Sequence, residues 1–107
     1  MKRTLTLFAL MGLGAMALST SASWKTFQEK YNIQKESHIG TVACQNCHVG
    51  KHGGKLNAYG KDLAAVMKEA ETKKLTPEFL SKIEKLDSTK SGETNIVKIK
   101  GDKSPGQ

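Results

Sequence analysis

Apolar side chains recur three and four residues apart in several stretches of the chain, a spacing typical of helices with one buried face. The first stretch begins at Ser23, a residue type that caps helices, and carries Trp24, Phe27 and Tyr31. The second covers residues 60–70, with apolar positions at Leu63, Val66, Met67 and Ala70. These patterns predict two amphipathic helices that share a core.

A third helix is predicted from Thr76 onwards, because a capping residue, a proline and an acid follow one another at positions 76–78. Its apolar side would be formed by Phe79, Leu80, Ile83 and Leu86. Residues 95–100 form a short last element, and the tail from residue 101 is expected to fray. Residues 32–37, the glycine-rich 49–55 and 87–94 are expected to be loops. No stretch alternates as a strand does, so the expected class is all-α, a small domain with long loops.

The first 22 residues differ from the rest of the chain. Lys2 and Arg3 precede an uncharged, apolar run over residues 4–18, and small residues follow at 19–23. That order is typical of a secretory signal, and the run is too short to span a bilayer. We expect cleavage after Ala22, which leaves one domain over residues 23–107. The sequence therefore predicts an exported, soluble, periplasmic protein without membrane insertion.

The remaining chain is basic without being rich in arginine. Without Lys2 and Arg3, the chain has 15 basic and 10 acidic residues, a net charge of +5, and every basic residue is lysine. Nucleic-acid binders usually employ arginine for bidentate phosphate and base contacts, so no nucleic-acid partner is expected. The lysines are either a solvated surface or a positive rim that steers acidic redox partner proteins. The two interpretations are compatible.

One motif carries the chemistry. Cys44, two intervening residues, Cys47 and His48 form a C-x-x-C-H sequence. Two thiols at this spacing can each add to one haem vinyl group, and the following imidazole then reaches the iron from the same side. Domains of this size have thin cores and usually need a staple, which a buried haem would provide. The motif predicts one covalent haem c, held by thioethers at Cys44 and Cys47, with His48 as the proximal iron ligand.

Other uses of the two cysteines fit the sequence less well. A thioredoxin-like dithiol needs a strand–helix–strand setting, which the pattern does not show. A zinc site needs four ligands at spacings that this chain lacks. A disulfide that closes a loop of two residues would stabilise little. No carboxylate pair or Ser-His-Asp set accompanies the motif, so an enzyme is not expected.

The second axial ligand decides between an electron carrier and an open site, and the sequence leaves it open. Met67 lies on the apolar stripe of the second predicted helix and is the preferred candidate. His38 lies six residues before Cys44 and is its rival, and His52 belongs to the glycine-rich loop. A ligated iron predicts periplasmic electron transfer between Fe(III) and Fe(II). An open or labile distal site would instead predict a haem-based sensor or ligand-binding module.

With these elements in place, the chain resembles the small exported monohaem cytochromes c of anaerobically respiring bacteria. The resemblance covers nearly all of residues 24–106. It depends on the C-x-x-C-H motif and on four neighbouring features: Phe27-x-x-x-Tyr31, a Leu-Asn-x-Tyr-Gly segment over residues 56–60, Lys61-Asp62-Leu63, and Leu86-Asp87-Ser88. It implies a cytochrome c-like domain that transfers electrons in the cell envelope.

The C-terminal part also looks like the calcium loop that often closes such proteins, in a degenerate, EF-hand-like form over residues 87–98. The first acid, Asp87, is retained, but the next two ligand positions hold Thr89 and Ser91. Lys98 stands where a bidentate glutamate would bind the ion, and so brings an ammonium towards a dication. We therefore expect the loop shape without calcium binding, with Lys98 free to pair internally with Asp87.

Overall fold

The computed structural model describes residues 21–50 and 53–107. The predicted signal segment, residues 1–22, lies outside the described residues except for Ser21 and Ala22, and it stays a prediction. His52 also lies outside the described part of the chain.

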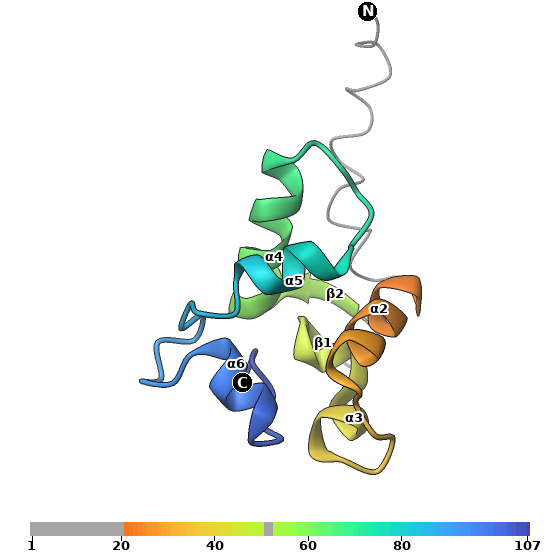
Figure 1. Cartoon of the computed structure of the whole chain (residues 1–107), viewed down its shortest axis with the longest axis vertical. Helices are drawn as coiled ribbons and strands as arrows, with labels where there is room; N and C mark the ends of the chain where they lie inside the picture. The colour runs from red at the N-terminus through yellow and green to blue at the C-terminus, as the bar shows by residue number, and fades with distance from the viewer. Residues whose placement is uncertain (1–20, 51–52) are drawn as a thin grey trace, which may run out of the picture.

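The described chain is mostly helical, with a long connection over residues 83–94 between its last two helices (Figure 1). They are α2 (Ser21–Tyr31), α3 (His38–Val42), the 3₁₀ turn η2 (Ala43–Asn46), β1 (His48–Gly50), β2 (Gly53–Leu56), α4 (Ala58–Glu69), α5 (Pro77–Lys82) and α6 (Asn95–Lys100). The predicted helices at residues 60–70 and from 76 onwards are confirmed as α4 and α5, and the short last element predicted at residues 95–100 is the helix α6. The first helix is also confirmed, although it begins at Ser21, so Ser23 lies within its first turn and not at its cap.

The expectation of an all-α fold was wrong in one place. Strands β1 and β2 pair antiparallel, with His48 opposite Leu56 and Gly50 opposite Gly53, where a flexible glycine-rich loop was predicted. The register is irregular between His48 and Gly50. So short a hairpin is held by backbone pairing and needs no alternating side-chain pattern. Gly54, at φ +87°, supplies a conformation that other residues rarely adopt.

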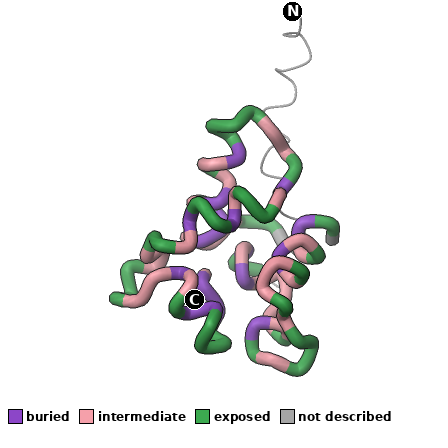
Figure 2. The backbone as a smooth tube through the Cα atoms, viewed as in Figure 1, coloured by how far each residue is buried: buried purple, intermediate pink, exposed green. Residues whose placement is uncertain are grey.

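The core forms where α2, α4 and α5 meet, and each of these helices carries buried positions, drawn in purple in Figure 2. Phe27 of α2 stacks on Trp24, with ring centroids 5.6 Å apart, and meets Tyr31 edge-on at 5.2 Å and Tyr59 at 6.3 Å. The Tyr31 hydroxyl donates to Glu84 Oε2 at 2.7 Å. The buried apolar side chains are Phe27, Ile39, Tyr59, Leu63, Met67, Leu75, Leu80, Ile83 and Ile99.

Two predicted apolar stripes extend less far than expected. Helix α4 ends at Glu69, so Ala70 is exposed at the helix end. Helix α5 ends at Lys82, and Leu86, beyond its end, is 45% exposed. Both predictions assumed that the helix continues to the last apolar residue of its stripe. The chain turns away before the last apolar residue of each stripe can join the core.

The tail was expected to fray, and this prediction was also wrong. Ser104 and Pro105 are buried, and the Asp102 carboxylate accepts hydrogen bonds from the backbone N–H groups of His38 and Ile39 at 2.9 and 3.0 Å. The tail thus binds back onto α3.

Among the helices that the structure describes, none combines the length and the apolar character that a membrane crossing requires.

Candidate functional site

The segment that carries the motif residues 44–48, here called the cysteine loop, follows directly from α3. The Ser37 hydroxyl accepts from the Gly40 N–H at 3.0 Å and caps α3. Ala43 then turns the chain with φ 47° and ψ −113°, a combination that a residue with a Cβ rarely adopts. This sharp turn leads into η2 and presents Cys44 and Cys47 to the interior.

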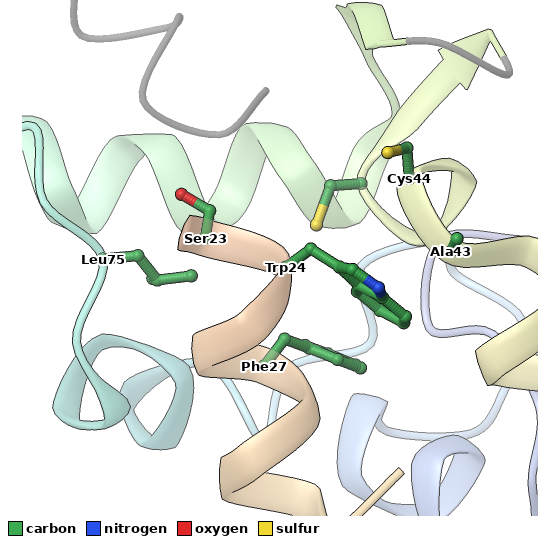
Figure 3. Close-up of a pocket in the computed structure, with 7 residues that line it drawn as sticks. Ser23, Trp24, Phe27, Ala43, Cys44 and Leu75 are labelled. Carbon is green, nitrogen blue, oxygen red and sulfur yellow. The ribbon is translucent and has the colours of Figure 1, made fainter. Parts of the chain in front are cut away.

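Both cysteines line one apolar hollow. Its other walls are Ser23, Trp24 and Phe27 of α2, together with Ala43 and Leu75. In Figure 3 the Trp24 indole and the Phe27 ring extend from α2 towards the side of the hollow where Ala43 and Cys44 lie. The hollow is small, with a volume of about 20 Å³, which is room for little more than one water molecule. The predicted thioether positions therefore share one apolar surface.

The two thiols are free and are not joined in a disulfide. Cys47 is half-buried as a residue, but its sulfur is packed more deeply. Burial, and to a lesser degree the neighbouring Cys44, raise the pKa of the Cys47 thiol to about 12. A thiol with so high a pKa is protonated at neutral pH, which is unlike the low-pKa thiolates of dithiol redox enzymes.

The His48 side chain is buried, with 2% of its surface exposed. Its Nδ1 lies 2.9 Å from the Gly54 carbonyl oxygen on the paired strand. When Nδ1 carries the proton, it donates to this carbonyl, and Nε2 carries the lone pair that binds a metal. Metal-binding histidines are commonly oriented in this way by a carbonyl on the second ring nitrogen. The hairpin that the sequence did not predict thus orients the predicted proximal ligand.

Two buried side-chain polar atoms find no hydrogen-bond partner among the described residues: the Asn46 Oδ1 and the Tyr59 hydroxyl. Asn46 belongs to the cysteine loop. Tyr59 has no exposed surface, and burial, with Cys47 as the largest charge effect, raises the pKa of its phenol. A buried polar group without a partner is costly, so such groups commonly indicate a site. Sequence reasoning gave Tyr59 no role of its own and named its position only within the Leu-Asn-x-Tyr-Gly segment over residues 56–60.

The structure does not bring the distal candidates to the hollow. Met67 is buried in the core with Phe27 and Leu75, which line the hollow, but Met67 itself does not line it. The His38 side chain is exposed at the start of α3, beside the Asp102 carboxylate. His52 lies outside the described residues. The choice of distal ligand stays a prediction.

The C-terminal loop, residues 87–98, is closed by its own groups. Asp87 accepts from the Ser91 and Gly92 N–H groups at 2.9 and 2.7 Å, and these hydrogen bonds lower the pKa of its carboxyl. The Lys98 ammonium is buried and donates to Thr89 Oγ1 at 2.6 Å and to the Gln107 carbonyl oxygen at 2.8 Å. Lys98 therefore pairs internally, as expected, but with Thr89 and the tail and not directly with Asp87.

No three His, Cys, Asp or Glu side chains gather as metal ligands within residues 21–50 and 53–107. The cysteine loop is a different kind of donor set. Its two free thiols line one apolar hollow, and the imidazole of His48, next in the sequence, does not itself line that hollow. Two buried polar atoms nearby lack hydrogen-bond partners. Two thiols followed by a histidine are the residue types that could hold a haem by two thioethers and one iron ligand. Comparison of the chain with family models, curated proteins and solved structures finds no match.

Proposed function

We propose that this protein is an exported c-type cytochrome that carries electrons in the periplasm on one covalent haem. The observation that carries the proposal is the shared apolar hollow of Cys44 and Cys47, directly followed by the oriented imidazole of His48. Neither a zinc site nor a redox dithiol requires the aromatic side chains, Trp24 and Phe27, with which α2 lines the hollow. The proposal assigns the protein no catalytic residues.

Each part of the site has a physical role in this function. When bound, haem supplies one-electron exchange between Fe(III) and Fe(II). Cys44 and Cys47 hold the group permanently, and His48 supplies the proximal nitrogen while the Gly54 carbonyl fixes the ring orientation. Trp24, Phe27 and Leu75 exclude water from one face of the hollow. An apolar surrounding of this kind tunes the potential of the metal.

Mass spectrometry of the mature protein, produced with haem-maturation machinery, tests the attachment. One added haem should survive acid–acetone extraction, and the Cys44→Ala, Cys47→Ala double variant should lose it. The spectrum of His48→Ala should report loss of the proximal ligand. Haem that extracts from the wild type, or that stays covalent in the double variant, would overturn the proposal.

A sensor or ligand-binding module with an open distal site is the second candidate. It is favoured by the positions of Met67 in the core and of His38 on the surface, neither of which lines the hollow. Carbon monoxide should bind the reduced protein readily in this case and poorly in a six-coordinate carrier. A weak absorption band near the red edge of the ferric spectrum, abolished in Met67→Leu, would establish methionine ligation. A change to high spin in His38→Ala would establish histidine ligation instead.

The lysine-rich surface supports acidic redox partner proteins and gives no support for nucleic acid as a partner. After the predicted signal cleavage the net charge is +5. Exposed charges are screened over about 10 Å at 0.1 M salt, so the bimolecular electron-transfer rate with an acidic partner should fall as salt rises. A rate that does not depend on ionic strength would leave the lysines as a solvated surface only.

A further inference from the structure

One side chain, Asn57, joins the cysteine loop to helix α4. Its Oδ1 accepts from the Gly60 N–H at 2.9 Å and so caps α4. Its Nδ2 donates to the carbonyl oxygens of Gln45 and Asn46 at 3.0 and 3.1 Å. Its backbone N–H donates to the Cys47 carbonyl oxygen at 2.8 Å. Three consecutive backbone carbonyls of the cysteine loop therefore accept hydrogen bonds from Asn57.

The packing around Asn57 leaves little room for the loop to shift. A Cβ added at Gly60 would overlap the Cys47 carbonyl oxygen, so α4 approaches the loop as closely as its backbone allows. A Cβ added at Gly106 would overlap the Asn57 Nδ2 and the Asn46 carbonyl oxygen. The start of α4 therefore packs closely against the cysteine loop, and the tail at Gly106 packs closely against both Asn57 and the loop. Backbone contacts this close require glycine on the approaching segment.

Capping alone does not explain an asparagine at this position. A cap needs only an acceptor, and serine, threonine or aspartate supply one as well. Asparagine adds a second group, an NH₂ with two donors, on the same short side chain. Here the Asn57 NH₂ group donates to two carbonyl oxygens of the cysteine loop. The contacts with this loop therefore explain why the capping residue is an asparagine.

We propose that Asn57 is a positioning residue for haem attachment: it fixes the Cys44–Cys47 segment relative to α4 so that both thiols reach one macrocycle. This inference rests on the proposed function. Since Tyr59, Leu63 and Met67 project from α4 into the core, the same contacts also set the distance between the proximal segment and these side chains. Asn57 therefore influences both how completely haem is attached and the environment of the iron.

Two substitutions distinguish the hydrogen bonds that Asn57 donates to the cysteine loop from its capping of α4. Asn57→Asp keeps the acceptor for the Gly60 N–H but places a carboxylate oxygen against the Gln45 and Asn46 carbonyls. Asn57→Ser keeps a capping hydroxyl and removes the donors without adding charge, and is the milder variant. Loss of two hydrogen bonds, at roughly 1 kcal/mol each, shifts the equilibrium between the ordered and the displaced cysteine loop by about thirtyfold. We expect the fraction of chains with covalent haem to fall in Asn57→Asp by up to this factor, and by less in Asn57→Ser.

The matched control is Asn95, a buried carboxamide of the C-terminal loop that donates to the Ile83 carbonyl oxygen at 2.8 Å and to Ser88 Oγ at 3.0 Å. Asn95→Asp should lower the melting temperature without changing haem content or midpoint potential. The readouts are haem stoichiometry by intact mass, midpoint potential, and hydrogen exchange of residues 44–48 in the haem-free Cys44→Ala, Cys47→Ala background. Faster exchange and a shifted potential in the Asn57 variants, absent in Asn95→Asp, support the proposal.

Wild-type haem content, potential and exchange in both Asn57 variants, with only a lower melting temperature, would refute the positioning role. That outcome leaves the proposed function standing. A wild-type protein without covalent haem would overturn the proposed function, and with it any role of Asn57 in attachment. If Asn57→Asp does not accumulate, Asn57→Ser and the hydrogen exchange measurement decide the question.

Discussion

The cysteine loop and the C-terminal loop are both short segments, yet they differ in how their buried groups find partners. In the C-terminal loop, Asp87 is bonded to backbone N–H groups and the Lys98 ammonium to Thr89 and Gln107. Two buried side-chain atoms lack a partner among the described residues: the Asn46 Oδ1 of the cysteine loop and the Tyr59 hydroxyl of α4. The contrast teaches that a loop which resembles a ligand site can be complete by itself, whereas an incomplete one points to a group outside the chain.

Backbone conformation alone does not separate the two loops. The C-terminal loop has positive φ at Lys90 (56°) and at Gly92 (97°). The turn that leads into the cysteine loop has Ala43 at φ 47° and ψ −113°. A residue with a Cβ in such a region costs of order 1–3 kcal/mol, and strain of this kind concentrates at functional sites. Both segments carry one such residue, so the difference between them lies in the partners of their buried groups.

The largest expected effect is at Lys98. Lys98→Ala removes a buried stem and the donor to two oxygens, so the free energy of unfolding should fall by about 3 kcal/mol. Lys100→Ala, at an exposed position of the same helix, should change it by less than about 0.5 kcal/mol. Urea unfolding of the two variants measures both. Equal effects would mean that the C-terminal loop does not depend on its internal ammonium.

Tyr59 should respond to haem in a way that no residue of the C-terminal loop does. In the haem-free Cys44→Ala, Cys47→Ala background, Tyr59→Phe removes a partnerless hydroxyl and should leave stability unchanged or raise it. In the holoprotein the same substitution should cost about 1 kcal/mol, because the hydroxyl then has a partner to lose. Thermal unfolding of the four proteins gives both differences. The same cost in both backgrounds would contradict this interpretation.

Acid should loosen the C-terminal loop. Hydrogen bonds from Ser91 and Gly92 lower the pKa of Asp87 in the folded protein below its ordinary value of 3.8. Its stabilisation is therefore fully present above about pH 4 and is lost as the pH falls through the folded-state pKa. Asp87→Asn should make unfolding less dependent on pH below 4. Hydrogen exchange of the Ser91 and Gly92 amides locates the effect, and an unchanged acid limb would refute it.

The smallest expected effect is that of calcium. Lys98 places an ammonium within the loop that resembles a calcium site, and Asp87 is already bonded to the backbone. The wild-type melting temperature should be the same with millimolar CaCl₂ and with chelator, and calorimetry should show no saturable binding. Lys98→Glu, which restores a carboxylate at the twelfth position, is the variant in which calcium dependence should first appear. Micromolar binding by the wild type would show that the loop is not closed by itself.

Sequence reasoning located what local patterns encode. The helical periodicities predicted α2, α4 and α5, and the motif spacing predicted that Cys44 and Cys47 lie on one surface. The β1–β2 hairpin was not predicted because backbone pairing of glycine-rich segments leaves no pattern of side chains in the sequence. The burial of Ser104 and Pro105 in the tail was not predicted because it depends on tertiary contacts, which local sequence patterns do not encode.

The partners of Asn57 could be found only in three dimensions. Sequence reasoning named this residue only within the Leu-Asn-x-Tyr-Gly segment, and nothing indicated that it would cap α4 or that its NH₂ group would meet Gln45 and Asn46. The distal ligand could not be derived for a related reason. Both Met67 and His38 have ordinary structural roles in the fold, one in the core and one on the surface.

The contacts of Asn57 and those of Asp102 differ in how much chain each must close. Asn57 reaches Gln45 across 12 residues, whereas Asp102 reaches His38 across 64. The entropic cost of closing a flexible chain grows with the logarithm of its length, so the longer closure costs about 1.5 kcal/mol more. Segments with short closures fold faster. We therefore expect the cysteine loop and the start of α4 to reach their final arrangement before the tail docks, so the two thiols are spaced for attachment while the rest of the chain is still assembling.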